Sequence, residues 1–140
     1  MNMASIVTAL AAVLATPAVA TAQATKSPKG LWLNPHGSVA VRTDACGDKM
    51  CGWIVWASSD AQKDARDSGV DRLVGTMLLE DYRPRGPASW SGTVFVPDMG
   101  RHFSSEIDAI SPGQLKIKGC VLGGLICKSQ VWSRIERLPQ

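Results

Sequence analysis

Short runs of alternating apolar and polar residues, separated by turn-forming residues, dominate the chain from residue 30 onward. Alternation with a period of two is typical of strands that bury one face. Gly, Pro, Asn and Asp, which favour tight turns, separate most of these runs. The pattern predicts strands over residues 30–33, 38–43, 51–56, 75–82, 90–96, 101–110, 114–122 and 125–135.

Residues 57–74 interrupt this rhythm. They are rich in Asp, Lys, Arg and Ser, with one possible helical turn at residues 60–66, so we expect a long loop or short helix there. A sheet of eight hairpin-linked strands can close on itself and so remove its exposed edges. The predicted fold is therefore all-β, a small eight-stranded up-and-down antiparallel barrel, with an open sandwich as the alternative.

The first 24 residues differ in composition from the rest. They hold no charged side chain, and an apolar run over residues 6–15 is followed by Pro17 and small residues. A short apolar core followed by A-x-A sites is typical of a secretory signal peptide, with an ordinary first helix as the alternative. We expect cleavage after Ala24, or failing that after Ala20. Residues 25–140 then form a single periplasmic or secreted domain without a further transmembrane segment.

Four cysteines in a short exported chain indicate two disulfides. Zinc is the alternative, but neither cysteine spacing is that of a structural zinc site. The local spacings favour the pairs Cys46–Cys51 and Cys120–Cys127. The dipeptide Gly123-Gly124 suits a two-residue hairpin turn, and such a turn pairs residues whose numbers sum to 247.

That register divides the last hairpin into an inward and an outward face. Gln130 and Arg134 fall on the inward face, and we expect them to converge as the polar groups that orient a small amphipathic or anionic ligand. Strand alternation also predicts that Trp53 and Trp56 point to opposite faces. The candidate ligand-binding residues of the barrel interior are Trp32, Phe103, Leu115, Ile117, Gln130, Trp132 and Arg134.

The formal charge of +3 is spread along the chain, which argues against nucleic acid as a partner. No hydrolase, phosphate-loop or dinucleotide motif is present. His102 with Glu106 or Asp108 fits a solvated strand face better than a catalytic pair, because the three residues are spread along one strand. We therefore expect a protein that is not an enzyme and uses no metal or other cofactor.

Several motifs carry a resemblance over essentially the whole domain: Gly30-Leu-Trp32, residues 46–56, residues 90–100 and residues 115–134. In these the chain resembles the exported bacterial family called domain of unknown function 2147, which is similar in fold to calycins, the barrels that include lipocalins. The G-x-W opening and late-strand arginine of calycins look like Gly30-x-Trp32 and Arg134. The resemblance implies an eight-stranded barrel outside the cytoplasm and supplies no activity.

Two functions remain open. The first is a binding module whose interior holds a small amphipathic or anionic ligand. The second is a non-enzymatic envelope structural or protein-interaction factor with a packed interior. A void of about 300 Å³ or more favours the first, and a filled interior the second.

Overall fold

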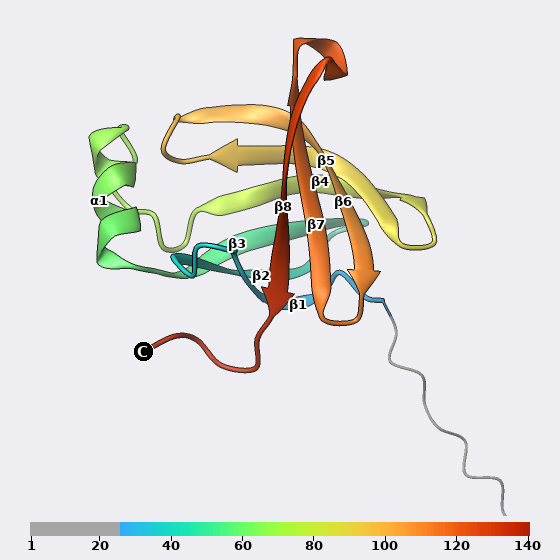
Figure 1. Ribbon diagram of the computed structural model, residues 1–140, viewed down its shortest axis with the longest axis horizontal. Coiled ribbons are helices and arrows are strands. Elements are labelled where there is room, and N and C mark those ends of the chain that lie inside the picture. The colour runs from blue at the N-terminus through green and yellow to red at the C-terminus, as the bar shows by residue number, and fades with distance from the viewer. Residues whose placement is uncertain (1–25) are drawn as a thin grey trace, which may run out of the picture.

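The computed structural model describes residues 26–140 (Figure 1). The predicted signal peptide and its cleavage site lie outside the described residues. Each strand pairs antiparallel with the next, and β8 returns to β1, so the sheet closes into a barrel and the predicted fold class is confirmed. The strands are β1 Gly30–Leu33, β2 Val39–Cys46, β3 Lys49–Ala57, β4 Met77–Gly86, β5 Ser89–Val96, β6 Arg101–Ser111, β7 Gln114–Val121 and β8 Ile126–Arg134.

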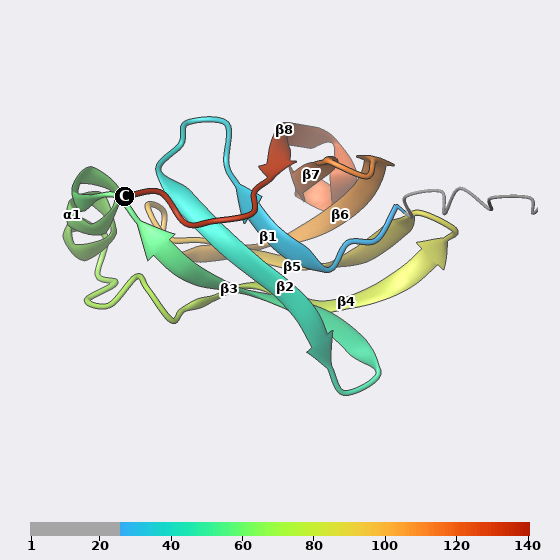
Figure 2. The same ribbon diagram turned by 90° about the horizontal axis from the view of Figure 1, so that it is seen from below.

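The up-and-down order divides the connections between two ends of the barrel. One end, here called the mouth, carries the β1–β2 loop, the β3–β4 connection with helix α1 Ser59–Asp67, the β5–β6 turn and the short helical turn η1 Leu122–Gly124. The other, here called the closed end, carries residues 26–29 and the β2–β3, β4–β5 and β6–β7 turns. Figures 1 and 2 show α1 at the end of β3, and Figure 1 shows the β7–β8 hairpin projecting from the barrel.

Inward-facing side chains fill most of the barrel interior. Small barrels of eight strands are just wide enough for such side chains to pack against each other across the interior. The largest fully buried side chains are Trp32, Val41, Ile54, Leu79, Tyr82, Ile107 and Leu115. This packing forms the hydrophobic core of the domain.

Helix α1 covers one side of the mouth, which agrees with the helical turn predicted for this segment. Ser58 caps the helix by accepting a hydrogen bond from the Ala61 amide at 3.2 Å. Ala65 on its inner face is 1% exposed and belongs to the core. At the helix end the Ser68 hydroxyl donates to the Asp98 carbonyl at 2.7 Å, which ties α1 to the β5–β6 turn.

Trp53 and Trp56 lie on the same face of β3, so the prediction of opposite faces is wrong. Trp53 pairs with Arg42 and Trp56 with Ala40, while Val55 has no partner on β2. This extra residue is a β-bulge, and a bulge reverses the alternation beyond it. Both tryptophans therefore share the outer face of the barrel.

Strand β4 continues through Pro84 to Gly86, beyond residue 82, where the predicted strand ends. Pro84 pairs with Trp90 of β5. On its other side β4 has already passed the last pair with β3, Met50 with Tyr82. A proline is tolerated there because that edge needs no backbone donor.

Candidate functional site

The closed end is built around a stack of Trp32 and Arg134, which pair across β1 and β8. The Arg134 Cζ atom lies 4.2 Å from the centre of the Trp32 ring. The indole Nε1 of Trp32, itself fully buried, donates to the Pro28 carbonyl and the Thr43 hydroxyl, each at 3.0 Å. Trp32 is thus the floor of the barrel rather than an open stacking platform.

Arg134 donates hydrogen bonds to backbone carbonyls from all three of its guanidinium nitrogens. Nε donates to the Pro112 carbonyl, Nη1 to that of Lys29 and Nη2 to that of Ser27, each at 2.8 Å. These bonds join the β6–β7 turn and the N-terminal segment to β8. Arg134 therefore closes this end of the barrel and does not converge with Gln130, which lies four residues nearer the mouth.

A recess of about 320 Å³ lies beside this floor, between residues 27–29 and the β2–β3 and β4–β5 hairpins. Its apolar lining comes from Met50, Tyr82, Pro84 and Trp90. Lys29, Asp48 and Lys49 also line it, so the recess opens among charged loops at the outside of the closed end. It does not continue the candidate interior on β7 and β8.

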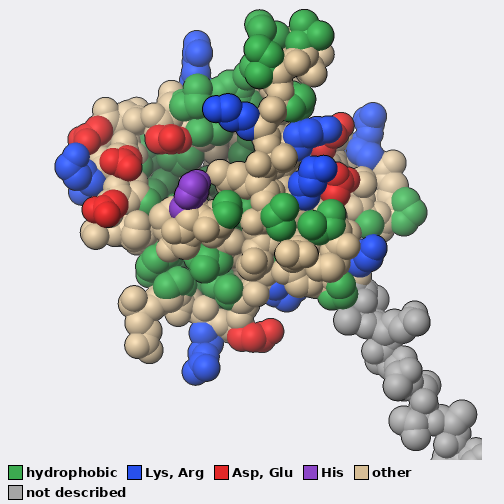
Figure 3. All heavy atoms as spheres, viewed as in Figure 1, with side chains coloured by type: hydrophobic (Ala, Val, Ile, Leu, Met, Phe, Trp, Pro, Cys, Tyr) green, Lys and Arg blue, Asp and Glu red, His purple; other side chains and the backbone are tan. Residues whose placement is uncertain are grey.

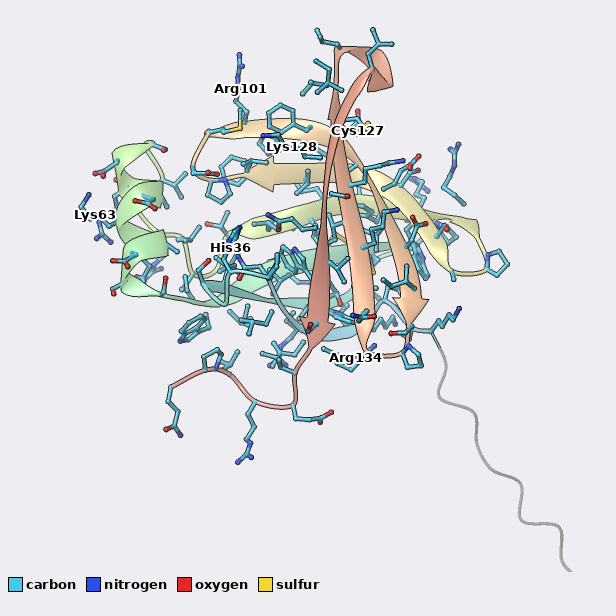
Figure 4. All side chains as sticks on the ribbon, in the orientation of Figure 1. His36, Lys63, Arg101, Cys127, Lys128 and Arg134 are labelled. Atoms are coloured by element: carbon cyan, nitrogen blue, oxygen red, sulfur yellow. A yellow bond between two sulfur atoms is a disulfide. The ribbon has the colours of Figure 1, made fainter. Side chains whose placement is uncertain are left out.

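The mouth is open along β8. This strand pairs with β1 only at Arg134 and Ser133, because β1 ends at Leu33. The remainder of β8, from Ile126 to Trp132, has its ladder partner on the β7 side alone. The space-filling view shows a hollow floored by hydrophobic side chains between α1 and β8 (Figure 3), and Figure 4 places Lys128 and His36 beside it.

Burial along the inner face of β8 changes from one end to the other. Trp132 is 6% exposed, whereas Gln130, Lys128 and Ile126 on the same face are exposed. The opposite strand follows the same gradient, from Leu115 at 0% exposed to half-buried residues near the tip. On its β7–β8 side the barrel is therefore filled at the closed end and open toward the mouth.

The predicted interior residues divide between these two regions. Leu115 and Ile117, 0% and 7% exposed, pack on the floor with Trp32 and Trp132. Phe103 is half-buried nearer the mouth, on the inward face of β6. Near it, a Cβ added to Gly119 would meet only the Val94 side chain, at 3.6 Å, so there is room at this position.

Polar groups at the mouth offer donors to a ligand. Gln130 Oε1 accepts from the Trp132 indole nitrogen at 2.9 Å, which leaves the amide nitrogen of Gln130 free to donate outward. Within residues 26–140, no carboxylate lies within ion-pair distance of Lys128 or Arg101. The mouth therefore combines apolar walls with unpaired cations on its β6 and β8 side, while the α1 side carries acidic residues.

Two buried hydroxyls face the barrel interior without a hydrogen-bond partner among residues 26–140, those of Tyr82 and Ser105. Sequence patterning did not single out either residue. Burial raises the pKa of the Tyr82 phenol well above its usual value; the nearby Ser105 hydroxyl opposes this in part, and the charge of Glu80 adds to it. This pair places polar atoms in an otherwise apolar core.

Tyr82 is the single tyrosine of the chain, so tyrosinate absorbance reports on it alone. We expect the folded protein to show no tyrosinate at pH values slightly above 10, and the signal to appear on unfolding. Because the unfolded state loses this proton first, the free energy of unfolding should fall by up to about 1.4 kcal/mol per pH unit above about 10. Urea titrations of the parent and of Tyr82→Phe, one below and one above pH 10, test this. The free energy of unfolding of the variant should lack the decrease that Tyr82 causes. Equal loss in both would contradict it.

The polar residues on the outer face of β6 do not come together as a catalytic site. His102 Nε2 lies 3.1 Å from Glu80 Oε1 of β4. Glu106 instead pairs with Lys118 at 2.6 Å and raises its pKa, and Asp108 accepts from the Ser89 hydroxyl at 2.6 Å. These residues form separate surface contacts.

Both predicted disulfides, Cys46–Cys51 and Cys120–Cys127, are present. The register of the last hairpin is also as predicted, with Leu115 opposite Trp132. Gly123 and Gly124 have φ values of 64° and 94°, as a tight turn requires. Leu122 also adopts a positive φ, of 52°, so it leaves the ladder and η1 replaces the last predicted pair.

Residues 30–134 match the family described as "Uncharacterized protein conserved in bacteria", domain of unknown function 2147. The chain belongs to this family. Protein HP1028 of Helicobacter pylori, described as belonging to the lipocalin family, is similar in structure, with a TM-score of 0.61 and 15% sequence identity over 79% of this chain and 84% of that chain. This likeness concerns the fold. No curated protein matches the chain in sequence.

Proposed function

We propose that this family member binds a small amphipathic or anionic ligand in the mouth of its barrel. The observation that carries the proposal is the burial gradient along β8, where Lys128 and Gln130 share the face of the buried Trp132 yet are exposed. A barrel packed solid would bury such positions. A lipocalin-like fold supports the same conclusion, because a barrel of eight strands is wide enough to hold one small ligand where side chains do not fill it.

The chemistry of the mouth suits a ligand with an apolar body and a negative head. Phe103 and Val94 offer apolar contact beside the unfilled position at Gly119. The ammonium of Lys128 and the amide nitrogen of Gln130 are donors at the rim. Arg134 takes no part in this proposal, since its donors are satisfied by carbonyls at the closed end.

The proposed location is the periplasm or the exterior of the cell. Two disulfides are typical of an oxidising compartment outside the cytoplasm. Between residues 26 and 140, no helix is long and apolar enough to span a bilayer. Removal of the leader over residues 1–24 belongs to the same proposal.

Titration with oleate, followed by tryptophan emission, tests the ligand proposal. We expect a Kd in the micromolar range, on the order of −8 kcal/mol. Gly119→Phe should weaken binding at least about tenfold by filling the mouth. Lys128→Gln should weaken oleate more than oleyl alcohol, which has the same body without the charge, while Lys63→Gln on α1 should change neither.

Gln130→Leu adds a test of specificity. The substitution removes the outward donor while keeping the volume, so it should alter the preference between the two probes more than it alters stability. If neither probe changes the emission or the melting temperature, the mouth does not bind such ligands. The alternative, a structural or protein-interaction role in the envelope, would then be favoured.

A further inference from the structure

Among residues 26–140 the most exposed apolar group is the tip of the β7–β8 hairpin, residues 121–126, here called the hairpin tip. Leu122, Leu125 and Ile126 are 68%, 85% and 53% exposed. Figure 1 shows this hairpin projecting past the rest of the barrel. A cluster of exposed apolar side chains of this kind often marks a site of interaction with another molecule.

The tip is held in this projecting form. The Cys120–Cys127 disulfide joins the two strands directly below it, and Val121 pairs with Ile126 above the disulfide. The Leu125 amide donates to the Leu122 carbonyl at 3.3 Å across the turn. The exposed leucines therefore belong to a braced hairpin rather than to a loose loop.

The tip itself carries no charged side chain, and the nearest charged residues of the β7–β8 hairpin are basic. These are Lys118 and Lys128, two residues below Cys120 and one residue below Cys127. Arg101, which begins β6, adds a further positive charge on the neighbouring turn, and Figure 4 places it beside Lys128 at the same end of the molecule as the tip. Lys118 is paired with Glu106, but within residues 26–140 Lys128 and Arg101 have no such partner.

We propose that the hairpin tip docks on the anionic surface of a phospholipid bilayer, with Leu122 and Leu125 inserted among the headgroups. A narrow convex projection fits a deformable lipid interface, whereas a protein partner would need a matching groove. From Cys120 to Gly123 the chain advances three residues, which is at most about 10 Å at strand rise. This reach matches the depth of about 5–10 Å at which apolar groups lie in the interface.

The positive residues behind the tip would then face the headgroups. Each Lys or Arg near an anionic leaflet is attracted to it, and this attraction weakens with salt. The docking does not depend on ligand binding in the mouth, because Leu122 and Leu125 lie on the turn beyond the inward-facing ladder positions.

Co-sedimentation with vesicles tests the proposal, using protein exported with its own leader and an N-terminus verified by mass. We expect binding to phosphatidylethanolamine vesicles with about a third phosphatidylglycerol, weaker binding to pure phosphatidylcholine, and a further decrease as salt rises. Leu122→Asn combined with Leu125→Ser should lower the partition coefficient at least about tenfold. Asn tolerates the positive φ of position 122, so the fold is retained.

Ile110→Ser is the matched control, because Ile110 is 43% exposed but lies at the closed end. It should bind vesicles like the parent, and circular dichroism should show all variants folded. Equal binding of the parent and the double variant, or equal binding to neutral and anionic vesicles, would overturn the proposal. A dimer seen by analytical ultracentrifugation and lost in the double variant, without vesicle binding, would assign the tip to a second copy and likewise overturn it.

Discussion

Arg134→Ala is expected to lower the free energy of unfolding by about 3 kcal/mol, measured by urea denaturation. The substitution leaves three carbonyls without their charged donor and removes the cation from the Trp32 ring. It also removes the contact that ties residues 27–29 to β8. The estimate stands below the sum of three charged hydrogen bonds because Arg134 is partly exposed.

Two further variants separate the planar contact from simple charge. Arg134→Lys should restore little, because an ammonium cannot donate to three carbonyls in a plane or stack on the indole. Arg137→Ala, in the exposed tail, is the control and should change stability by less than about 0.5 kcal/mol. A double-mutant cycle of Arg134→Ala with Trp32→Phe that gives no coupling energy would show that the stack does not stabilise the barrel.

Gly92→Ala is expected to cost at least about 3 kcal/mol, or to prevent folding. A Cβ at this position would lie 2.6 Å from the Glu80 carbonyl oxygen and 2.8 Å from the Tyr82 ring. Neither atom can move easily, since the first belongs to the backbone and the second to a fully buried ring. The melting temperature of Gly92→Ala, compared with that of the parent, measures the loss of stability.

Gly86→Ala is the matched control on the same hairpin. No atom lies within 4 Å of a Cβ added to Gly86, so this substitution should be close to neutral. Comparable losses in both variants would mean that the glycine at position 92 is not required by the packing of Tyr82. They would instead point to a general cost of altering this hairpin.

Much of this fold follows from local pattern. The Cys120–Cys127 spacing with two glycines between the cysteines predicts the hairpin register, and the register places Leu115 opposite Trp132 as observed. The pairing of Gly30-x-Trp32 with a late arginine predicts the strand neighbours that close the barrel. Such features depend on contacts between neighbouring strands, which alternation and turn chemistry encode directly.

Other features depend on irregular backbone, which alternation does not encode. The bulge at Val55 moves Trp56 to the outer face, and no residue type at that position announces it. The hydroxyls of Tyr82 and Ser105 face the same interior because β4 and β6 lie on either side of β5, an arrangement that neither strand's own pattern encodes.

The sequence also carries a signal for the open mouth, namely the unequal lengths of the first and last strands. Asn34-Pro35 ends the first strand after four residues, whereas the last strand runs for nine. Strands so unequal in length cannot pair along their whole length. The residues of β8 that have no partner on β1 are the ones that border the mouth. A comparison of the lengths of the first and last strands would therefore have predicted both the gap and the exposure of Gln130 and Lys128.

Native mass spectrometry of the protein recovered after export from its own host tests the central claim, ligand binding in the mouth, most directly. We expect a folded protein with both disulfides and an added mass of one small molecule, lost on gentle activation. Gly119→Phe, exported in the same way, should carry little or none of this mass. A parent protein that is folded and fully oxidised but free of added mass, and that binds neither oleate nor oleyl alcohol in solution, would contradict the account.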